Sequence, residues 1–234
     1  MSLKKSHGNM YDWVTHMHSH IAGKCSHECS YCYVQKNRFG VSPRYQGEAR
    51  LVAEEFSVKY GKDKIIFIEH MNDMFAEDVK DEWIKKILFH CCDWQDNQYV
   101  FQTKNPLRAL EFEGKFPEKH IIGTTIETNR SLGELSKAPN PHTRYTGIYT
   151  LMAKGSKTFI TIEPILDFDV EVLSRWIIDA NPDFINIGAD SKRTNLPEPS
   201  PEKIKELIKN LQEAKINIKK KINLGRLLTN PTQG

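Results

Sequence analysis

Short apolar runs alternate along the chain with longer amphipathic stretches, and this alternation constrains the fold more than any other feature. The runs are rich in Ile, Val, Phe and Thr, as buried strands are. Strands that alternate with helices at this spacing are joined by crossovers, and they therefore pair in parallel. The candidate strands cover residues 14–21, 64–70, 98–103, 120–127, 157–165, 184–189 and 216–222.

The clearest of the intervening helices is predicted over residues 199–214. Ser200 is a good N-cap residue, and Pro201 suits the first helical position. The apolar residues that follow recur at i, i+3, i+4 and i+7, which gives the helix one buried face. Similar stripes predict helices over residues 78–92 and 169–180.

A chain of 234 residues with six or seven such strand–helix units fits one α/β domain. Eight units would close a barrel, so this count predicts a partial (β/α) barrel of about six or seven parallel strands, or an open sheet. We expect the single domain to span residues 1–234, with a loop marked by the prolines of residues 137–143. In barrels and open sheets alike, active residues gather at the carboxyl ends of the strands.

The composition excludes several classes of protein. Hydrophobic residues make up 39% and charged residues 27%, which indicates a globular rather than a disordered chain. No apolar run approaches the ~18 residues that a membrane span needs, and the N-terminus lacks the apolar core of a signal peptide. We therefore expect a cytoplasmic protein without a membrane partner.

The net charge of +3 is too small to indicate nucleic-acid binding by itself. Residues 215–234 form a more basic C-terminal strand and tail. Its charges fit either a solvated face or a binding surface, and solvated faces are the commoner case. The basic residues are Lys215, Lys219, Lys220, Lys221 and Arg226.

Three cysteines lie close together in the loop that follows the first candidate strand. Residues 23–34, GKCSHECSYCYV, place them with the spacing C-x3-C-x2-C. A disulfide would leave one thiol over, and a structural zinc site takes four ligands, usually with paired C-x2-C spacing. A 4Fe–4S cluster held by three thiolates keeps one iron open, as catalytic metal sites do. The predicted metal ligands are Cys25, Cys29 and Cys32.

Other residues fit this cluster less well. His27 sits between two of the cysteines, where the spacing makes it a poor fellow ligand. Cys91 and Cys92 fall on a predicted helix, and we interpret them as small buried hydrophobes. Because the cytoplasm is reducing, an odd total of five cysteines does not indicate a disulfide framework.

The motif C-x3-C-x-Tyr-C after the first strand of an α/β barrel resembles that of the radical S-adenosylmethionine (SAM) superfamily. The resemblance implies that the open iron binds the amino and carboxylate groups of SAM. It implies further that the reduced cluster cleaves SAM to methionine and a 5′-deoxyadenosyl radical. Tyr31, before the third cysteine, would then lie against the adenine.

Further short motifs follow in the order of one subfamily, which is named from phage-encoded proteins of unknown function. That subfamily is distantly similar to spore photoproduct lyase, a DNA-repair enzyme. Each motif is weak alone, and their order carries the resemblance. The motifs are NDMFAED, FQTKNP, GTTIETN, RYTGIYTLM, TIEPIL, NIGADS and KINL.

A site for SAM needs an acceptor near its ammonium and donors near its carboxylate. Asn72 and Asp73 stand where many radical SAM enzymes carry Gly-Gly-Glu, and Asp73 is either an acceptor for the amino group or a helix N-terminal acid. Thr125 and Glu127 share one face by strand alternation, where an acid can bind the ribose hydroxyls or the amino group. The resemblance implies that Arg144 reaches the SAM carboxylate, with a surface arginine as the alternative.

Four further polar residues are expected to line the lumen of the barrel and to shape substrate recognition. Glu163 ends a strongly apolar strand, and a carboxylate buried there needs a charged partner. Lys104, after the third strand, and Lys221, at the last strand, are the candidate partners. Asn223 lies beside Lys221 in the KINL motif.

His16, His18 and His20 alternate along the first candidate strand and therefore share a face. Such a run is compatible with a metal site, although ordinary polar or packing roles are commoner. One of these histidines is also a candidate for the barrel interior near SAM.

The resemblance thus implies a radical SAM enzyme that cleaves SAM at a 4Fe–4S cluster and abstracts hydrogen from a substrate in the lumen. We expect a ferredoxin or flavodoxin as the electron donor, and a protein partner that closes the open side of the barrel. The lyase resemblance and the basic tail suggest a nucleic acid or nucleotide derivative as the substrate. The alternative function is a non-catalytic iron–sulfur or zinc protein that senses redox state or carries electrons.

Overall fold

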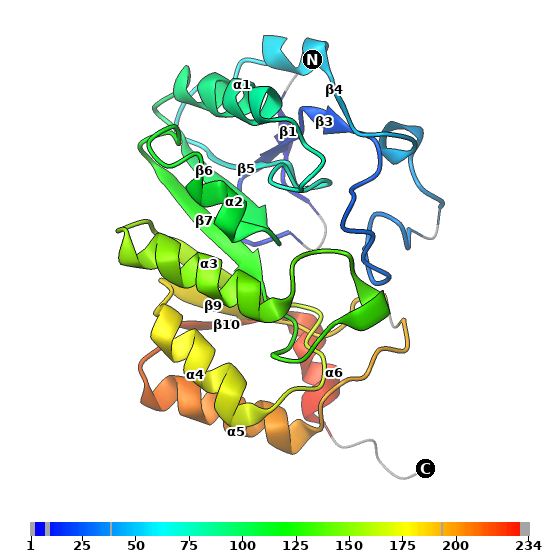
Figure 1. The fold of residues 1–234 in the computed structure, drawn as a ribbon, viewed down its shortest axis with the longest axis vertical. Helices are drawn as coiled ribbons and strands as arrows, with labels where there is room; N and C mark the ends of the chain where they lie inside the picture. Colours follow the sequence, from blue (N-terminus) through cyan, green and yellow to red (C-terminus); the bar gives the residue numbers. More distant parts are fainter. Residues whose placement is uncertain (1–2, 8–9, 38, 193, 230–234) are drawn as a thin grey trace.

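Eight strands form one sheet through the middle of the molecule (Figure 1). The computed structural model describes residues 3–7, 10–37, 39–192 and 194–229. The strands of the sheet, in chain order, are β1 (Lys4–Lys5), β2 (His16–His18), β5 (Ile65–Ile68), β6 (Gln98–Thr103), β7 (His120–Thr125), β8 (Thr158–Ile162), β9 (Phe184–Ile187) and β10 (Ile218–Lys220).

The order of the strands across the sheet is β1-β2-β5-β6-β7-β8-β9-β10. Every neighbouring pair from β2 to β10 is parallel, which confirms the predicted partial (β/α) barrel. β1 pairs with β2 in antiparallel orientation, and within the described residues nothing pairs β1 with β10, so the sheet stays open. β1 was not predicted because it consists of Lys4 and Lys5, a composition typical of exposed edge strands.

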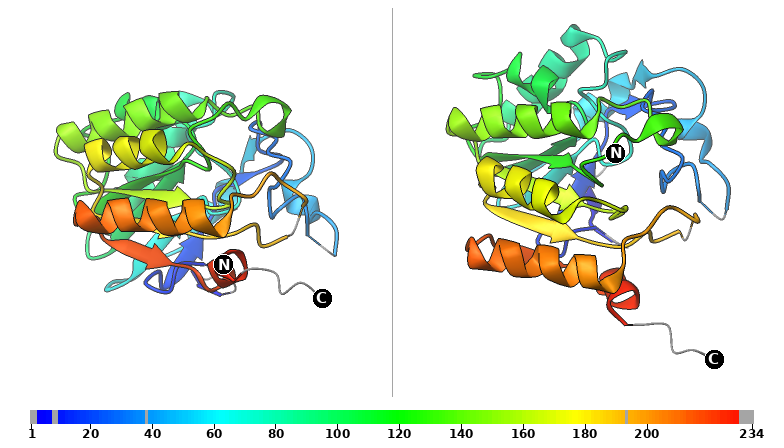
Figure 2. Two further views of the ribbon diagram at one scale, coloured as in Figure 1. Left: turned by 90° about the horizontal axis from the view of Figure 1, so that it is seen from below. Right: turned by 60° about the horizontal axis from the view of Figure 1, so that its bottom comes forward.

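Helices cover one face of this sheet. Figure 2 shows α3, α4 and α5 side by side against that face, in the order of the strands that they connect. Within the described residues no helix is both long and apolar enough to cross a bilayer. The helices are α1 (Asp81–Cys92), α2 (Pro106–Leu110), α3 (Pro141–Ala153), α4 (Val170–Ala180), α5 (Pro201–Glu213) and α6 (Gly225–Leu228).

The helix boundaries agree with their capping residues. α5 begins as predicted, because the Ser200 hydroxyl accepts a hydrogen bond from the backbone N–H three residues further on. The loop predicted over residues 137–143 is wrong at its second half, since α3 already begins at Pro141. Asn140 caps this helix by accepting from the Thr143 N–H at 2.8 Å, so Asn-Pro marks a helix start here.

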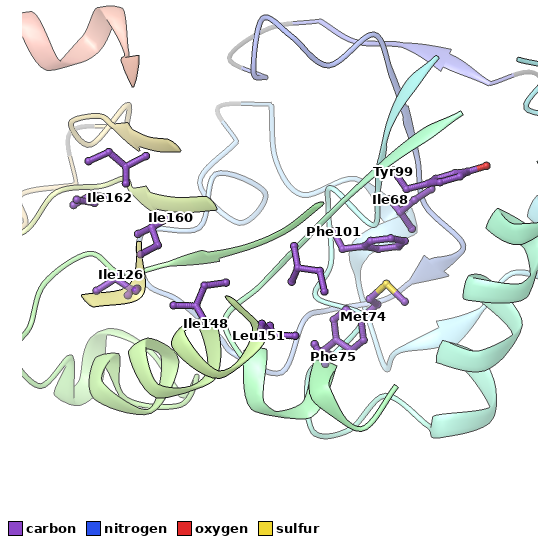
Figure 3. Packing of buried hydrophobic residues seen from close by; sticks show 14 of the residues in the cluster. Ile68, Met74, Phe75, Tyr99, Phe101, Ile126, Ile148, Leu151, Ile160 and Ile162 are labelled. Atoms are coloured by element: carbon purple, nitrogen blue, oxygen red, sulfur yellow. The ribbon is translucent and has the colours of Figure 1, made fainter. Parts of the chain in front are cut away.

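The main apolar core lies between the helices and the sheet (Figure 3). Ile148 and Leu151 on α3 point toward Ile160 on β8 and Phe101 on β6, and all four side chains are at most 2% exposed. Burying side chains of this size stabilises the fold by roughly 1.5–3 kcal/mol each. The core therefore fixes the positions of the strand ends that carry the polar residues.

The opposite face of the sheet, called the lumen face below, carries a second cluster that contains no helix residue. Phe159 and Phe184 stack there at 5.3 Å between ring centroids. Tyr11 and Trp13, from the segment before β2, pack edge-on against Phe159 at 5.8 and 6.1 Å. Gly123 permits this approach, because a Cβ there would lie 2.1 Å from the Phe159 ring. Tyr11 and Trp13 thus close the lumen at the end away from the carboxyl ends of the strands.

A layer of neutral polar side chains lies above these rings on the lumen face. The Tyr11 hydroxyl donates to Gln102 Oε1 and contacts Thr161 Oγ1, both at 2.7 Å. Gln102 Nε2 in turn donates to Thr125 Oγ1 at 2.9 Å, and Asn186 Nδ2 to Thr161 Oγ1 at 3.4 Å. These mutual hydrogen bonds make a closed floor beneath the strand ends.

The first candidate strand is divided into two short strands. β2 ends at His18, and the chain then enters β3 (Ile21–Ala22), which pairs with β4 (Arg50–Leu51) in a separate small sheet. His18 and His20 pack against Tyr60 and against His90 of α1, on the side that the helices cover. The expectation that one of these histidines faces the barrel interior is therefore wrong for this pair.

A chain of hydrogen bonds runs through the buried histidines. His90 Nε2 lies 3.1 Å from Val58 O and must donate to it, so a neutral His90 offers Nδ1 as an acceptor to His20 Nε2 at 2.9 Å. His20 Nδ1 then faces Glu69 Oε1 at 2.9 Å, with one proton between them. Glu69 also accepts from the backbone N–H groups of His20 and Ile21, which fixes the turn from β2 into β3.

The shared proton resides on Glu69 at neutral pH. Burial raises the pKa of Glu69 from 4.5 to about 8, although the two backbone donors oppose the shift. Burial, together with His90, lowers the pKa of His20 from 6.5 to about 3. Both shifts favour a neutral carboxylic acid beside a neutral imidazole.

We predict that Glu69 makes the fold less stable as the pH rises. A carboxyl group whose pKa is raised on folding gives stability that is complete below pH 4.5 and is lost as the pH rises through about 8. Between pH 6.5 and 8 the free energy of unfolding of the wild type, relative to Glu69→Gln, should fall by up to about 1.4 kcal/mol per pH unit. Urea denaturation at a series of pH values measures this difference.

The control for this measurement is Glu206→Gln, which changes an exposed glutamate on α5. Its stability should follow that of the wild type across the same pH range. Parallel curves for Glu69→Gln and the wild type would contradict the assigned proton.

Candidate functional site

The three cysteines lie in the cluster loop, defined as residues 23–34, which follows β3. Figure 2 shows this loop beyond the carboxyl ends of the strands, on the same side as the connections that leave β7 and β9. Gly23 begins the loop with φ +93°, and a Cβ there would lie 2.1 Å from Glu48 O. Its N–H donates to Arg44 O, and Lys24 N–H donates to Gly47 O, both at 2.8 Å. Glycine is therefore required where the cluster loop starts.

Cys25, Cys29 and Cys32 line one pocket of the structure together with Gly23 and Met71. Tight turns bring the cysteines to the same side, with Cys32 N–H donating to Cys29 O at 3.0 Å. All three are free thiols. The spacing C-x3-C-x2-C thus produces a single thiol-lined recess.

Two neighbouring loops hold the cluster loop in place. Ser30 N–H donates to Leu135 O, and Lys137 N–H donates to His27 O, both at 2.8 Å. On the other side, Asn72 Nδ2 donates to Gly23 O at 3.1 Å. The loop is thereby fixed against the segments that follow β5 and β7.

His27 and Asp73 form a buried pair behind the cysteines. His27 Nε2 contacts Asp73 Oδ2 at 2.8 Å, and Asp73 also accepts from the backbone N–H groups of Phe75 and Lys104. Burial raises the pKa of Asp73, but His27 outweighs it, so the net pKa is lowered. His27 therefore supports the loop through Asp73, and Asp73 already has three donors in this structure.

Glu127 lies at the centre of a buried polar cluster, called the Glu127 cluster below. Its Oε1 accepts from the Tyr31 hydroxyl at 2.6 Å and pairs with Lys104 Nζ, while its Oε2 accepts from Arg144 Nη1 at 2.7 Å. Lys104 Nζ also lies 4.7 Å from the centroid of the Tyr31 ring. Thr125 and Glu127 do share the lumen face, since Thr125 contacts Gln102 and Glu127 contacts Lys104.

The charges of the Glu127 cluster do not cancel. Burial raises the pKa of Glu127, but Arg144 and then Lys104 outweigh it and lower the pKa to about 2. One carboxylate against two cations leaves a surplus of one positive charge. Arg144 is 0% exposed rather than on the surface, and its Nη2 has no hydrogen-bond partner among the described residues. This combination suits an anionic group such as a carboxylate.

Glu163, Lys221 and Asn223 meet in a second group, called the Glu163 cluster below, at the ends of β8, β9 and β10. Lys221 Nζ lies 2.9 Å from Glu163 Oε2, and Asn223 Nδ2 donates to Glu163 Oε1 at 3.0 Å and to Ala189 O at 2.8 Å. Of the two lysines considered as partners for Glu163, Lys221 makes the contact and Lys104 belongs to the Glu127 cluster. The four residues expected to line the lumen are thus divided between two groups.

Cys25, Cys29 and Cys32 are the residues of the recess that could hold a metal group. In the described part of the chain, no three His, Cys, Asp or Glu side chains are placed to hold one metal ion. In a 4Fe–4S cluster each thiolate binds its own iron, so the three sulfurs surround the group instead of meeting at one point. Zinc in a structural site would require a fourth ligand, and His27 is engaged with Asp73.

Sequence reasoning missed two residues that complete the lumen floor, Tyr11 and Gln102. Gln102 had a signal, because period-2 alternation places it on the same face as Lys104. Tyr11 had none, since it precedes the first strand of the parallel set, and its position depends on contacts made across 91 and 150 residues of sequence.

Solved structures share this architecture. A mutant of spore photoproduct lyase aligns with a TM-score of 0.63 at 12% identity, over 92% of this chain and 79% of that chain. The lyase complexed with dinucleoside spore photoproduct aligns with a TM-score of 0.58 at 12% identity, over 90% and 64%. SuiB of Streptococcus suis bound to S-adenosylmethionine aligns with a TM-score of 0.59 at 14% identity, over 88% of this chain and 50% of that chain. The fold is thus similar to that of spore photoproduct lyase and SuiB, in agreement with the predicted partial (β/α) barrel and the predicted likeness to the lyase.

Comparison of the sequence with curated proteins finds no match. One family profile does match, over residues 10–191. This range includes the cluster loop and both polar clusters except for Lys221 and Asn223. Because the match covers most of the sequence, the chain belongs to the family described as Protein of unknown function (DUF5131).

Proposed function

We propose that this chain is a radical SAM enzyme that cleaves SAM reductively. The observation that carries the proposal is the recess lined by Cys25, Cys29 and Cys32 at the carboxyl end of a partial (β/α) barrel. The shared fold with radical SAM enzymes supports it. When bound, a 4Fe–4S cluster and SAM would supply one-electron cleavage of the sulfonium and a 5′-deoxyadenosyl radical.

Cys25, Cys29 and Cys32 would hold the cluster through their three thiolates. Burial, and next the charge of Asp73, raise the pKa of Cys25 to about 12, so binding of iron at this thiol would release a proton. His27 and Asn72 keep the loop closed around the recess through their bonds to Asp73 and Gly23. Three ligands leave the fourth corner for SAM.

The part of the Glu127 cluster is to orient SAM. The surplus positive charge and the unpartnered Nη2 support Arg144 as the group that attracts the SAM carboxylate. Tyr31 of the cluster loop is held by Glu127, and its ring would lie against the adenine. Thr125 would fix the floor, because its hydroxyl oxygen already accepts from Gln102. Asp73 would fix the cluster loop, because its carboxylate already bonds His27 and the Lys104 backbone N–H.

The lumen above the polar floor is the proposed place of hydrogen abstraction. Lys104, Glu163, Lys221 and Asn223 supply its charged and amide groups. The substrate proposed is a nucleic acid or nucleotide derivative, which the structural likeness to a lyase complexed with a dinucleoside photoproduct supports. A ferredoxin or flavodoxin would deliver the electron. The edge strands β1 and β10, each paired on one side only within the described residues, are places for a closing partner protein.

We predict that the anaerobically reconstituted full chain is brown and forms 5′-deoxyadenosine. It should contain about four irons and four sulfides per chain and should cleave SAM in the presence of dithionite. Iron and sulfide analysis with chromatography of the nucleoside products measures both properties. Four irons without SAM cleavage would support the redox sensor or electron carrier instead, and one zinc without sulfide would exclude both cluster proposals.

Replacing Cys29 by alanine should abolish cluster binding. Two thiolates cannot hold the cluster at three corners, so the iron content after reconstitution should fall to near zero. The matched control is Cys92→Ala at the end of α1, which lies outside the recess and should keep the full iron content. Full iron in Cys29→Ala, or an equal loss in Cys92→Ala, would contradict the assigned ligands.

A further inference from the structure

The two charged clusters at the strand ends differ in how completely they are closed. In the Glu127 cluster both carboxylate oxygens are engaged, and the Glu127 side chain is 0% exposed. In the Glu163 cluster the side chains of Glu163 and Lys221 are 15% and 14% exposed. Lys104 of the Glu127 cluster is 17% exposed, so the clusters differ in their carboxylates, and only the carboxylate of the Glu163 cluster is within reach of an added molecule.

The Glu163 cluster also contains an acceptor that the described residues do not satisfy. Both hydrogens of Asn223 Nδ2 are used, one toward Glu163 Oε1 and one toward Ala189 O. Asn223 Oδ1 is buried and has no hydrogen-bond partner among the described residues. A buried acceptor left in this state costs about 1–3 kcal/mol, so an N–H or O–H donor brought here would be favourable.

Gly188, which follows β9, brings the acceptor oxygens of this cluster to the same place. A Cβ on Gly188 would lie 2.9 Å from Glu163 Oε1 and 3.0 Å from Asn223 Oδ1. The two oxygens, from chain segments 60 residues apart, thus converge over the backbone of Gly188. Lys221 adds a cationic donor on the far side of the Glu163 carboxylate, at 2.9 Å from Oε2.

We propose that the Glu163 cluster is a subsite for the Watson–Crick edge of a guanine base, an inference that rests on the proposed function of the chain. A guanine edge offers two neighbouring donors, N1–H and the N2 amino group, beside the O6 acceptor. The Glu163 carboxylate and Asn223 Oδ1 accept from the two donors, and the Lys221 ammonium donates to O6. Along the guanine edge the order is O6, N1–H and the N2 amino group. The order Lys221, Glu163 and Asn223 Oδ1 in the cluster provides the matching donor and acceptors.

The charge of the cluster favours a neutral base edge over a phosphate group. Glu163 and Lys221 cancel, and a phosphate placed here would meet the carboxylate. Other bases fit less well, because adenine offers one donor and thymine places its single donor between two acceptors. The Glu163 cluster would therefore recognise the base, and other parts of the chain would bind the sugar and phosphate of a nucleotide substrate.

The test uses the reconstituted full chain with SAM added, so that a purine does not simply occupy the place of the SAM adenine. Calorimetric titration compares GMP with IMP, which lacks only the N2 amino group, and with N-acetylglutaminamide as a peptide-like amide. We expect GMP to bind on the order of tenfold more tightly than IMP, because IMP would leave the buried Asn223 Oδ1 without a donor. Equal affinities for GMP and IMP, or tighter binding of the amide, would overturn the inference.

Variants of the cluster locate the effect. Asn223→Ala removes one acceptor and should bring the GMP and IMP affinities within about twofold of each other. Gly188→Ala should weaken GMP binding by on the order of tenfold, because the added methyl group displaces the two converging oxygens. Gly225→Ala is the matched control, since a Cβ there meets nothing within 4 Å, and it should bind GMP like the wild type. Unchanged discrimination in Asn223→Ala, which leaves the backbone of β9 untouched, would also overturn the inference.

The outcome separates the subsite from the proposed activity. Formation of 5′-deoxyadenosine together with equal GMP and IMP affinities would refute the guanine subsite alone. The expected preference for GMP in a chain that does not cleave SAM would refute the radical activity and support the subsite.

Discussion

The burial of one carboxylate, that of Glu127, determines how the segments at the carboxyl ends of the strands are assembled. It joins a residue of the cluster loop, a residue after β6 and a residue on α3, which are otherwise held by separate loops. A buried carboxylate is tolerated only when its charge is matched and its lone pairs are used, so these three segments depend on one another. The cysteines therefore sit in a loop whose position is set by electrostatics as much as by backbone hydrogen bonds.

The strand ends divide the lumen into two regions of different character. One side, beside the cysteines, is closed and carries a surplus positive charge, which suits a permanent place for a charged cofactor. The other side, around Glu163, is neutral and partly open to solvent, which suits a molecule that enters and leaves. Between them lies the floor of mutually bonded side chains, which separates the charged groups from the aromatic cluster below.

The sequence predicted the features that depend on local residue patterns and missed those that depend on contacts between distant segments. Apolar periodicity and capping residues are local, so the parallel strands and the start of α5 were predicted. The grouping of Lys104 with Glu127, and of Lys221 with Glu163, depends on which strands are adjacent and on where each side chain bends, and periodicity does not carry that information. The division of residues 14–21 into β2 and β3 was missed because the turn is stabilised by Glu69, which lies 49 and 48 residues away from its two donors.

The aromatic pair Tyr11 and Trp13 gives the lumen a base that does not come from the barrel strands themselves. The base of the lumen face is consequently formed by a short stretch of chain that lies outside the strands and has no pairing register. Loss of the Tyr11 hydroxyl would take away its bonds to Gln102 and Thr161, whereas the pairing of the strands does not depend on either ring.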